Sequence, residues 1–417
     1  MSANLVGSEN RVMRKHLYRF PWSKTDNCGG WVEVTDECDL TCVGCYRSRL
    51  AGHRPLEDIK KDISMCHDLT RCDAMAIAGG EPLIYPHIVE VVEYIASRNI
   101  KPIILTNGVT LTREFASDLK NAGLAKFHFH IDSGQKRQGW IGKNEAELNR
   151  LRQKYADMVW DIGGLQCGYN ITVYRSTLKY LPEIVGWCRQ NMHKVQHISL
   201  IAFRAIPLND TIKLLARGKP IDLHSLYDVT FDGEEITITS EDMFWLLKKH
   251  FPDLRPCAYL GGTTSPETYK YLVTVLVGSK KGVYGVLGPK TVELVQIFYH
   301  LFKRRYCSFL RNPKAGKKLF LLSSFDREVR STFANFIRLS LRNPIRFFES
   351  LYTQTLHIQQ PNEIYDGDIN LCDGCANMMV HNDRLIHSCK LDEYRLFGEP
   401  VKAVEIKGRE DAPPGHG

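Results

Sequence analysis

Residues 36–47 read DECDLTCVGCYR and contain three cysteines, Cys38, Cys42 and Cys45, in the spacing C-x3-C-x2-C. The strand-like run 31–35 precedes them directly, so the cysteines lie on a loop at the end of a predicted strand. Three thiolates on one tight loop suit an iron–sulfur cluster that leaves one iron without a protein ligand. A structural zinc site usually takes four ligands, often as two CxxC-like pairs, and is the alternative interpretation together with chance.

The sequence around this loop alternates between two kinds of segment. Six units of alternating strand and helix, spread over about 175 residues, predict a parallel sheet that is closed or partly closed into a barrel. We therefore predict an α/β fold, a partial (β/α)6 barrel over residues 30–208, with its chemistry at the carboxyl ends of the strands. The strand-like runs are 31–35, 74–78, 102–106, 126–131, 168–174 and 196–203, and the helix-like segments are about 56–70, 87–98, 112–122, 144–160 and 178–191.

The pattern changes after residue 208, and we predict an α+β extension there. Its expected elements are a short helix at 241–250, a hairpin at 269–287 and helices at about 290–311 and 319–342. The resulting division is a lead-in (1–29), the core barrel (30–208), the extension (209–365), a turn-rich segment with further cysteines (366–402) and a disordered tail (403–417).

Polar motifs follow the predicted strands at their carboxyl ends. Ala78-Gly79-Gly80-Glu81-Pro82 follows the second strand, Thr106-Asn107-Gly108 the third and Ile131-Asp132-Ser133 the fourth. Asn170 on the fifth strand is a weaker match. With the cysteine loop, these motifs make residues 30–205 resemble the radical S-adenosylmethionine (radical SAM) superfamily.

The resemblance implies a cofactor and a set of site residues. Cys38, Cys42 and Cys45 would hold a catalytic [4Fe-4S] cluster whose open iron chelates S-adenosylmethionine (SAM). That family usually has an aromatic residue directly before the third cysteine, and this residue packs on the adenine. This chain has Gly44 at that position, so Tyr46 or a residue of the sixth strand is expected to pack on the adenine instead. The remaining expected SAM contacts are Gly79, Gly80, Glu81, Pro82, Asn107, Asp132, Ser133 and Asn170.

The resemblance also implies the reaction. SAM would be cleaved reductively to a 5′-deoxyadenosyl radical, which abstracts hydrogen from an unactivated carbon, with an electron donor such as flavodoxin or ferredoxin as a partner. His128 and His130 share a strand face with Asp132, so His130 lies near the substrate if that face lines the barrel. An interior histidine whose hydrogen bonds are satisfied is the alternative.

A second cysteine cluster lies near the carboxyl terminus, in the stretch LCDGCANMMVHNDRLIHSCKLDEY (371–394). Cys372, Cys375 and Cys389 resemble the auxiliary-cluster extensions (SPASM or Twitch) of radical SAM enzymes, which implies a second iron–sulfur cluster. Cys257 is the expected fourth ligand, and zinc bound by three cysteines and a histidine is the alternative. The other candidates for the fourth ligand are Cys307, Cys28, His381 and His387.

Composition and charge limit the partners. The chain has 417 residues, 43% apolar and 24% charged, with no apolar run long enough to span a membrane and no secretory signal, so we expect a cytoplasmic location. Residues 289–357 contain 13 Lys or Arg and four Asp or Glu, whereas the net charge of the whole chain is only +8. No base-reading motif accompanies this segment, so nucleic acid is not an expected partner.

The basic segment also has helical periodicity. Phe325, Val329, Phe333, Phe336, Ile337 and Leu339 fall on one arc of the helix at 319–342, and Arg327, Arg330, Arg338 and Arg342 fall on the opposite arc. This arrangement predicts a peripheral contact with the inner face of a membrane, and a helix packed on the barrel is the alternative. A lipid or isoprenoid substrate is therefore the first expectation. One alternative is a peptide or protein substrate. The other is that the protein is a non-catalytic electron carrier.

Overall fold

The computed structural model describes residues 14–43, 45, 47, 52–203, 212–221, 238–365 and 368–405. Gly44 and Tyr46 lie outside the described residues, so the predicted adenine contact of Tyr46 stays a prediction. Most of the predicted lead-in is described and supplies the short strand β1, Tyr18–Arg19.

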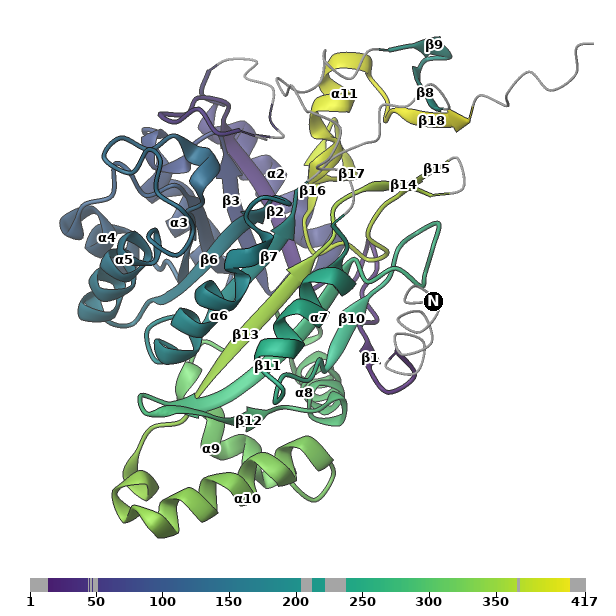
Figure 1. Cartoon of the computed structure of the whole chain (residues 1–417). Helices are drawn as coiled ribbons and strands as arrows, with labels where there is room; N and C mark the ends of the chain where they lie inside the picture. Colours follow the sequence, from purple (N-terminus) through teal and green to yellow (C-terminus); the bar gives the residue numbers. More distant parts are fainter. Residues whose placement is uncertain are drawn as a thin grey trace, which may run out of the picture.

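A large, mostly parallel sheet forms the body of the molecule (Figure 1). Its strands run in the order β1-β10-β11-β13-β7-β6-β5-β4-β3-β2, with β12 beside β11. The six predicted core strands are β2 (Gly29–Thr35), β3 (Ala74–Gly79), β4 (Lys101–Thr106), β5 (Lys126–His130), β6 (Gln166–Val173) and β7 (His197–Ala202). Each pairs in parallel with its neighbour, which confirms the α/β fold and the predicted chain order.

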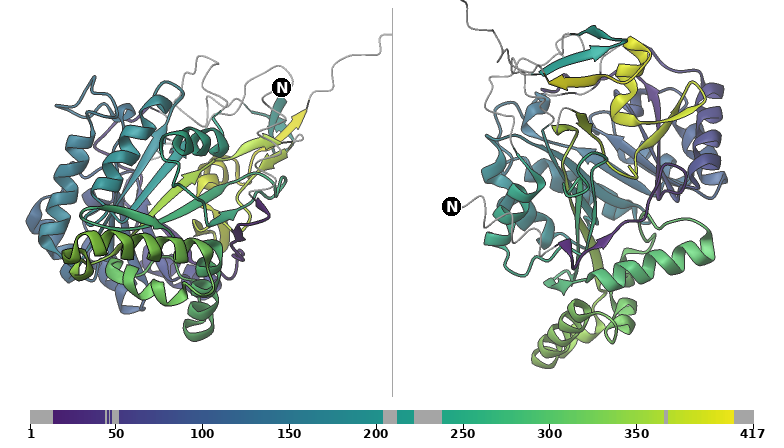
Figure 2. Two further views of the ribbon diagram at one scale, coloured as in Figure 1. Left: turned by 60° about the horizontal axis from the view of Figure 1, so that its bottom comes forward. Right: turned by 90° about the vertical axis from the view of Figure 1, so that its right-hand side faces the viewer.

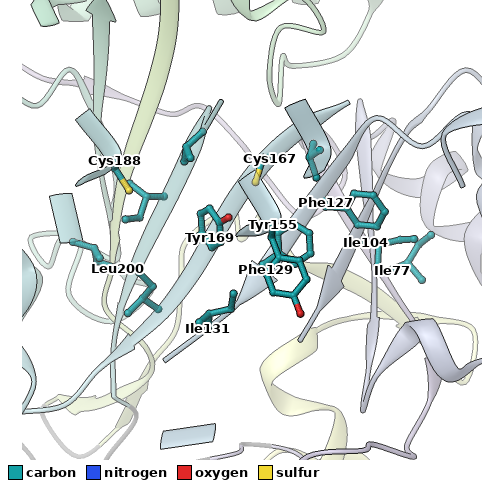
Figure 3. Packing of buried hydrophobic residues seen from close by; sticks show 14 of the residues in the cluster. Ile77, Ile104, Phe127, Phe129, Ile131, Tyr155, Cys167, Tyr169, Cys188 and Leu200 are labelled. Atoms are coloured by element: carbon teal, nitrogen blue, oxygen red, sulfur yellow. The ribbon is translucent and has the colours of Figure 1, made fainter. Parts of the chain in front are cut away.

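The five predicted core helices are also present. They cover one face of the sheet, because alternate strand residues turn apolar side chains towards them. On β5, Phe127 and Phe129 lie fully buried in this outer layer, and Tyr155 of α5 stacks on Phe129 with the ring centroids 4.7 Å apart (Figure 3). The helices are α2 (Leu56–Thr70), α3 (Ile88–Ser97), α4 (Arg113–Asn121), α5 (Asn149–Ile162) and α6 (Leu181–Gln190).

The sheet continues beyond the predicted boundary at residue 208. The strand β13 (Tyr352–Gln359), which the sequence analysis did not predict, pairs in parallel with β7. The predicted hairpin is present as β11 (Tyr271–Ser279) and β12 (Gly282–Val286), and β11 pairs antiparallel with β13. The core strands and the extension therefore share one sheet, which β10 (Ala258–Leu260) and β1 complete at the edge.

Smaller elements surround the sheet. The helix α7 (Ser240–His250) agrees with the predicted segment 241–250 and begins with a capping box between Thr239 and Asp242. The predicted tail begins too early, because residues 402–405 form β18, which pairs with β8. The other elements are β8 (Ile212–Ala216), β9 (Lys219–Pro220), β14 (Glu363–Tyr365), β15 (Asp368–Asn370), β16 (Met378–His381), β17 (Arg384–His387), α11 (Leu391–Phe397) and β18 (Lys402–Glu405).

The basic segment contains α8 (Pro289–Lys303), α9 (Gly316–Leu319) and α10 (Arg327–Arg342), at the end of the molecule opposite α11 (Figures 1 and 2). The predicted helix at 319–342 starts too early, because Asp326 caps α10 and leaves Phe325 outside it. The predicted apolar arc does not face outwards as a whole. Val329 and Phe336 of this arc are buried in an apolar cluster with Tyr284 of β12, so they pack against the hairpin.

A buried ion pair fixes the loop that follows β5. The Arg152 side chain on α5 is fully buried, pairs with Glu145 and donates to the Ile131 carbonyl at 2.8 Å. Glu145 in turn accepts a hydrogen bond from the Ser133 backbone N–H at 2.6 Å. The pair therefore holds the loop at 131–133 against α5.

We expect Arg152→Met to lower the free energy of unfolding by about 3–5 kcal/mol, because the Glu145 carboxylate would stay buried without its partner. Urea denaturation measures this change. The matched control is Arg150→Met, which removes an exposed arginine from the same helix and is expected to change stability by less than about 0.5 kcal/mol. A loss below about 1 kcal/mol in the Arg152 variant would contradict the assigned role.

Candidate active site

A cavity of about 560 Å³ lies inside the barrel. Cys38, Cys42 and Cys45 line it at the carboxyl ends of the strands, and Phe309 and Leu310 line it at the opposite end. The segment after α8 closes that opposite end, where Gln166 at the start of β6 donates to the Leu310 carbonyl at 2.6 Å. The three cysteines therefore face the interior at the end where parallel barrels place their chemistry.

Gly79 and Gly80 allow the end of β3 to contact the chain just before the cysteines. A Cβ atom on Gly79 would lie 2.2 Å from the Thr35 carbonyl oxygen, and one on Gly80 would lie 2.0 Å from that of Glu37. The Gly80 N–H donates to Thr35 and the Glu81 N–H donates to Glu37, both at 2.8 Å. These two amides therefore hold the start of the cysteine loop.

Glu81 joins the ends of two neighbouring strands. Its carboxylate is buried and accepts hydrogen bonds from the Thr106 hydroxyl at 2.6 Å, the Asn107 N–H at 2.7 Å and the Leu83 N–H at 3.0 Å. Burial raises the pKa of Glu81 to about 7, although these hydrogen bonds oppose the shift. Glu81 lines the cavity, as do Gly79, Gly80, Asn107 and Asn170, whereas Pro82 starts the short 3-10 turn Pro82–Ile84.

Asn107 holds the cysteine loop from the side of β4. Its side-chain amide donates to Asp39 at 2.5 Å, and Asp39 lies beside Cys38 in the loop. The Asn107 carbonyl oxygen accepts from Arg137 at 2.6 Å, and its side-chain oxygen accepts from the Val109 N–H at 2.8 Å. The polar motif after the third strand therefore positions the loop that carries the cysteines.

His130 faces the cavity, whereas the predicted ribose contacts Asp132 and Ser133 are not among the described residues that line it. Asp132 lies behind His130, with 2.6 Å between its carboxylate and Nε2 of the ring. Burial alone would lower the pKa of His130, but the Asp132 carboxylate outweighs burial and raises it. The Asp132 carboxylate thus favours the protonated form of His130 at the cavity wall. A direct contact of Asp132 or Ser133 with a ligand stays a prediction.

The three loop cysteines fit an iron–sulfur cluster by their chemistry and placement. All three thiols face one cavity, and such soft ligands suit iron–sulfur clusters. Burial raises the pKa of the Cys38 thiol. Within the described part of the chain, no three His, Cys, Asp or Glu side chains converge where one metal ion would bind. A [4Fe-4S] cluster does not require the three thiols to converge on one point, because each thiolate binds a different iron of the cluster.

The second cysteine cluster packs beside the barrel. Cys372 and Cys375 lie in one buried apolar cluster with Cys257, the expected fourth ligand. Cys389 lines the cavity and accepts a hydrogen bond from the Asn362 amide at 3.3 Å. Of the alternative fourth ligands, His387 contacts the Cys372 carbonyl oxygen at 3.3 Å, whereas Cys307 exchanges hydrogen bonds with Gln296 of α8 at the far end of the cavity.

Sequence reasoning missed Arg47, which follows the third cysteine. Its buried guanidinium pairs with Glu33 on β2, with Asp36 at 3.0 Å and with Asp392 on α11 at 2.9 Å. It also missed the inward polar residues Lys126, His197 and His357, which line the same cavity. The signal available in the sequence was the position of these residues within their strands. Each of them occupies a strand position whose side chain faces the cavity, as His128 and His130 do.

Sequence comparisons match part of the chain to a known family. The sequence model of the Radical SAM superfamily matches residues 32–162. A probable GTP 3',8-cyclase of Methanococcus maripaludis is 26% identical over 220 residues, which cover 51% of this chain and 67% of that protein. An Fe-coproporphyrin III synthase of Methanosarcina barkeri is 24% identical over 251 residues, which cover 56% of this chain and 60% of that protein.

A search of solved structures finds SuiB of Streptococcus suis, with a TM-score of 0.39 and 15% identity, over 55% of this chain and 46% of that chain. The match to the two curated relatives thus spans about two-thirds or less of their length.

We expect Glu81→Ala to lower the affinity for SAM by on the order of tenfold or more. The variant leaves the Thr106 hydroxyl and the amides of Asn107 and Leu83 without their acceptor, and each loss costs ~1–3 kcal/mol. Isothermal titration of the anaerobically reconstituted protein measures this change. The control is Glu57→Ala on the exposed face of α2, and unchanged SAM affinity in the Glu81 variant would show that this carboxylate does not organise the site.

Proposed function

The chain carries a radical SAM domain and is an iron–sulfur, SAM-dependent enzyme, and from this premise we propose that it abstracts hydrogen from an unactivated carbon of an elongated, largely apolar substrate. The observation that carries the proposal is the single cavity that joins the cysteine loop to the closed end of the barrel. A lipid or isoprenoid is the proposed substrate class.

The residues around the cysteine loop would prepare the site. Cys38, Cys42 and Cys45 would hold a [4Fe-4S] cluster, which when bound supplies the electron that cleaves SAM to methionine and a 5′-deoxyadenosyl radical. Glu81 and Asn107 fix the loop through the contacts described above, and His130 presents to the cavity a ring whose pKa is raised by Asp132. The barrel wall would exclude water, which protects a reactive intermediate from side reactions.

The cavity lining supports an apolar substrate. Ile103 and Leu105 of β4 and Val273 and Val275 of β11 turn towards the cavity, and Phe309 closes it. These strands contribute apolar side chains at the inward positions, where a polar substrate would need hydrogen-bond partners. The second cysteine cluster favours the alternative, a peptide-modifying enzyme, because its cysteines resemble an auxiliary-cluster segment.

The exposed apolar residues of the basic segment support contact with a membrane. On α8, Phe298, Leu301 and Phe302 are 52%, 67% and 75% exposed, and near α10 Phe348 is 89% exposed. Exposed apolar side chains beside Lys and Arg favour the interface of an anionic bilayer. No helix in the described residues is both long enough and apolar enough to cross a membrane. The exposed large apolar residues among the described part of this segment are Ile297, Phe298, Leu301, Phe302, Leu321, Phe325, Phe333, Leu341, Ile345, Phe347 and Phe348.

The membrane face differs from the one predicted from the sequence. The predicted arc included Val329 and Phe336, which are buried against the hairpin. The proposed face instead consists of the exposed part of α8 and of the residues at the two ends of α10. Both helices come to the front when the bottom of Figure 1 is turned towards the viewer (Figure 2).

We expect the triple variant Cys38→Ala, Cys42→Ala, Cys45→Ala to lose about four irons per chain after anaerobic reconstitution and to lose all SAM cleavage. Iron analysis and detection of 5′-deoxyadenosine measure both effects. The control is Cys188→Ala, a buried core cysteine on α6. Wild-type iron content in the triple variant would contradict the cluster assignment.

The same triple variant tests the second cysteine cluster. Iron that remains in the protein would support an auxiliary cluster at Cys372, Cys375 and Cys389. Zinc alone would instead support the structural zinc site, and a metal-free protein would contradict a second metal site.

We expect the protein to sediment with anionic vesicles at low salt and to be released at high salt. Each Lys or Arg near an anionic surface contributes ~1 kcal/mol, and salt screens that attraction within about 8–10 Å. Replacing Arg327, Arg330, Arg338 and Arg342 with Gln is expected to abolish most of the binding, because all four are exposed.

The matched control removes four exposed cations near α4 and α5 instead, namely Arg113, Lys143, Arg150 and Lys154. Equal loss of vesicle binding in both variants would indicate non-specific charge attraction. A wild-type protein that ignores anionic vesicles at low salt would contradict the membrane proposal and would favour the peptide substrate.

A further inference from the structure

Lys126 is a buried cation without a counterion. It is 3% exposed, it is the first residue of β5, and it lines the cavity near the closed end. No ion pair or hydrogen bond to Lys126 Nζ is present among the residues that the structure describes. Its one close partner is the ring of Phe309, whose centroid lies 3.7 Å from Nζ. Such an ammonium group is costly to bury unless something neutralises it.

The carboxylate of Asp73, which accepts from the cavity-lining residue Ser308, is already paired with another lysine. Asp73 pairs with Lys101 at 2.6 Å and also accepts hydrogen bonds from the Tyr299 hydroxyl at 2.7 Å and the Ser308 N–H at 2.9 Å. The Asp73 carboxylate is therefore occupied by Lys101, and no ion pair between it and Lys126 is present among the described residues. One positive charge at this end of the cavity has no partner within the described chain.

The neighbouring polar groups also lack partners. Nε2 of His128 and Nε2 of His357 are buried and make no hydrogen bond within the described residues. The His128 and His197 rings meet across Gly168, with centroids 4.7 Å apart, and a Cβ on Gly168 would lie 2.2 Å from His128. The cavity thus holds several nitrogen groups, and no ion pair between a carboxylate and Lys126, His128, His197 or His357 is present among the described residues.

We propose that Lys126, assisted by His128, binds the anionic end group of the substrate, a carboxylate or a phosphate. The inference rests on the proposed function, because it takes the occupant of the cavity to be the substrate. His130 lies four residues further along β5, ~13 Å away at the usual strand rise, so a substrate that reaches both ends of the strand must be elongated.

The electrostatic surroundings support this assignment. Burial, together with the nearby Lys101 charge, lowers the pKa of Lys126 to about 7. Burial also lowers the pKa of His128 and of His197, and it lowers that of His357 to about 4. Burial thus favours the neutral form of these groups, and an anion bound beside Lys126 would raise the pKa of Lys126 again and favour its charged form.

The test compares straight-chain probes that differ only in the end group. Dodecanoate, dodecyl phosphate and dodecanol are titrated into the reconstituted holoenzyme with SAM present. We expect the better of the two anions to bind on the order of 10- to 100-fold more tightly than the alcohol, because hydrogen bonds to charged groups are worth this factor. The ranking of the carboxylate and the phosphate identifies which end group the site takes.

Lys126→Met is expected to abolish the preference for the anions, whereas Lys126→Arg is expected to keep part of it. The control, Lys143→Met, removes an exposed lysine and is expected to leave the preference unchanged. Equal binding of the three probes to the wild type, a measurement that needs no variant, would overturn the proposal. A preference retained in Lys126→Met would overturn it too.

The formation of 5′-deoxyadenosine in the same preparation separates this proposal from the proposed function. SAM cleavage without a preference for the anions would overturn the anionic site and leave the function standing. A preference for the anions in an enzyme that does not cleave SAM would support the anionic site and contradict the function.

Discussion

The buried ion pairs of Arg47 are the interaction on which the arrangement of the active end depends. The Arg47 guanidinium pairs with Glu33 of β2, with Asp36 before the first cysteine and with Asp392 of α11. Arg395 of α11 also pairs with Asp36 at 2.8 Å. A buried carboxylate without its partner is costly, so these groups hold one another in place. The second cysteine segment is thereby fixed to the first cysteine loop, although more than 300 residues separate them.

Close backbone packing completes this end of the barrel. Gly79 has a φ of 138°, a conformation that suits glycine, and it lets β3 contact Thr35 at a distance that no side chain would permit. The motif after the second strand therefore has a structural reason that is independent of any ligand. Glu81 then connects this strand end to Asn107, and Asn107 connects it to the loop through Asp39. The polar motifs at successive strand ends form one continuous set of contacts around the cysteines.

The sequence predicted the core well because its signals are local. Alternating strand and helix segments set the order of the parallel strands, and the position of each motif after a strand set its place at the cavity. The strand β13 was missed because polar Gln354 occupies one of its buried positions, which interrupts the alternation of polar and apolar residues in YTQTLHIQ. The arc on α10 was correctly recognised as amphipathic, but periodicity does not tell whether lipid or a hairpin such as β12 covers the apolar face. The contacts of Arg47 and Lys126 join distant segments, so no local pattern could reveal them.

The cavity has a direction that follows from these contacts. At one end, the buried carboxylates of Glu81 and Asp132 lie near the cysteine loop, and at the other end Lys126 carries a charge that no described residue neutralises. Between them the inward residues of β4 and β11 are mainly apolar. We propose that the anionic end of a long substrate binds at Lys126, because Asp132 already pairs with His130 near the cysteine end whereas Lys126 has no such partner, so one orientation is favoured. This orientation places the end without charge beside the cysteine loop. The same asymmetry that anchors the anion would therefore choose which carbon is exposed to hydrogen abstraction.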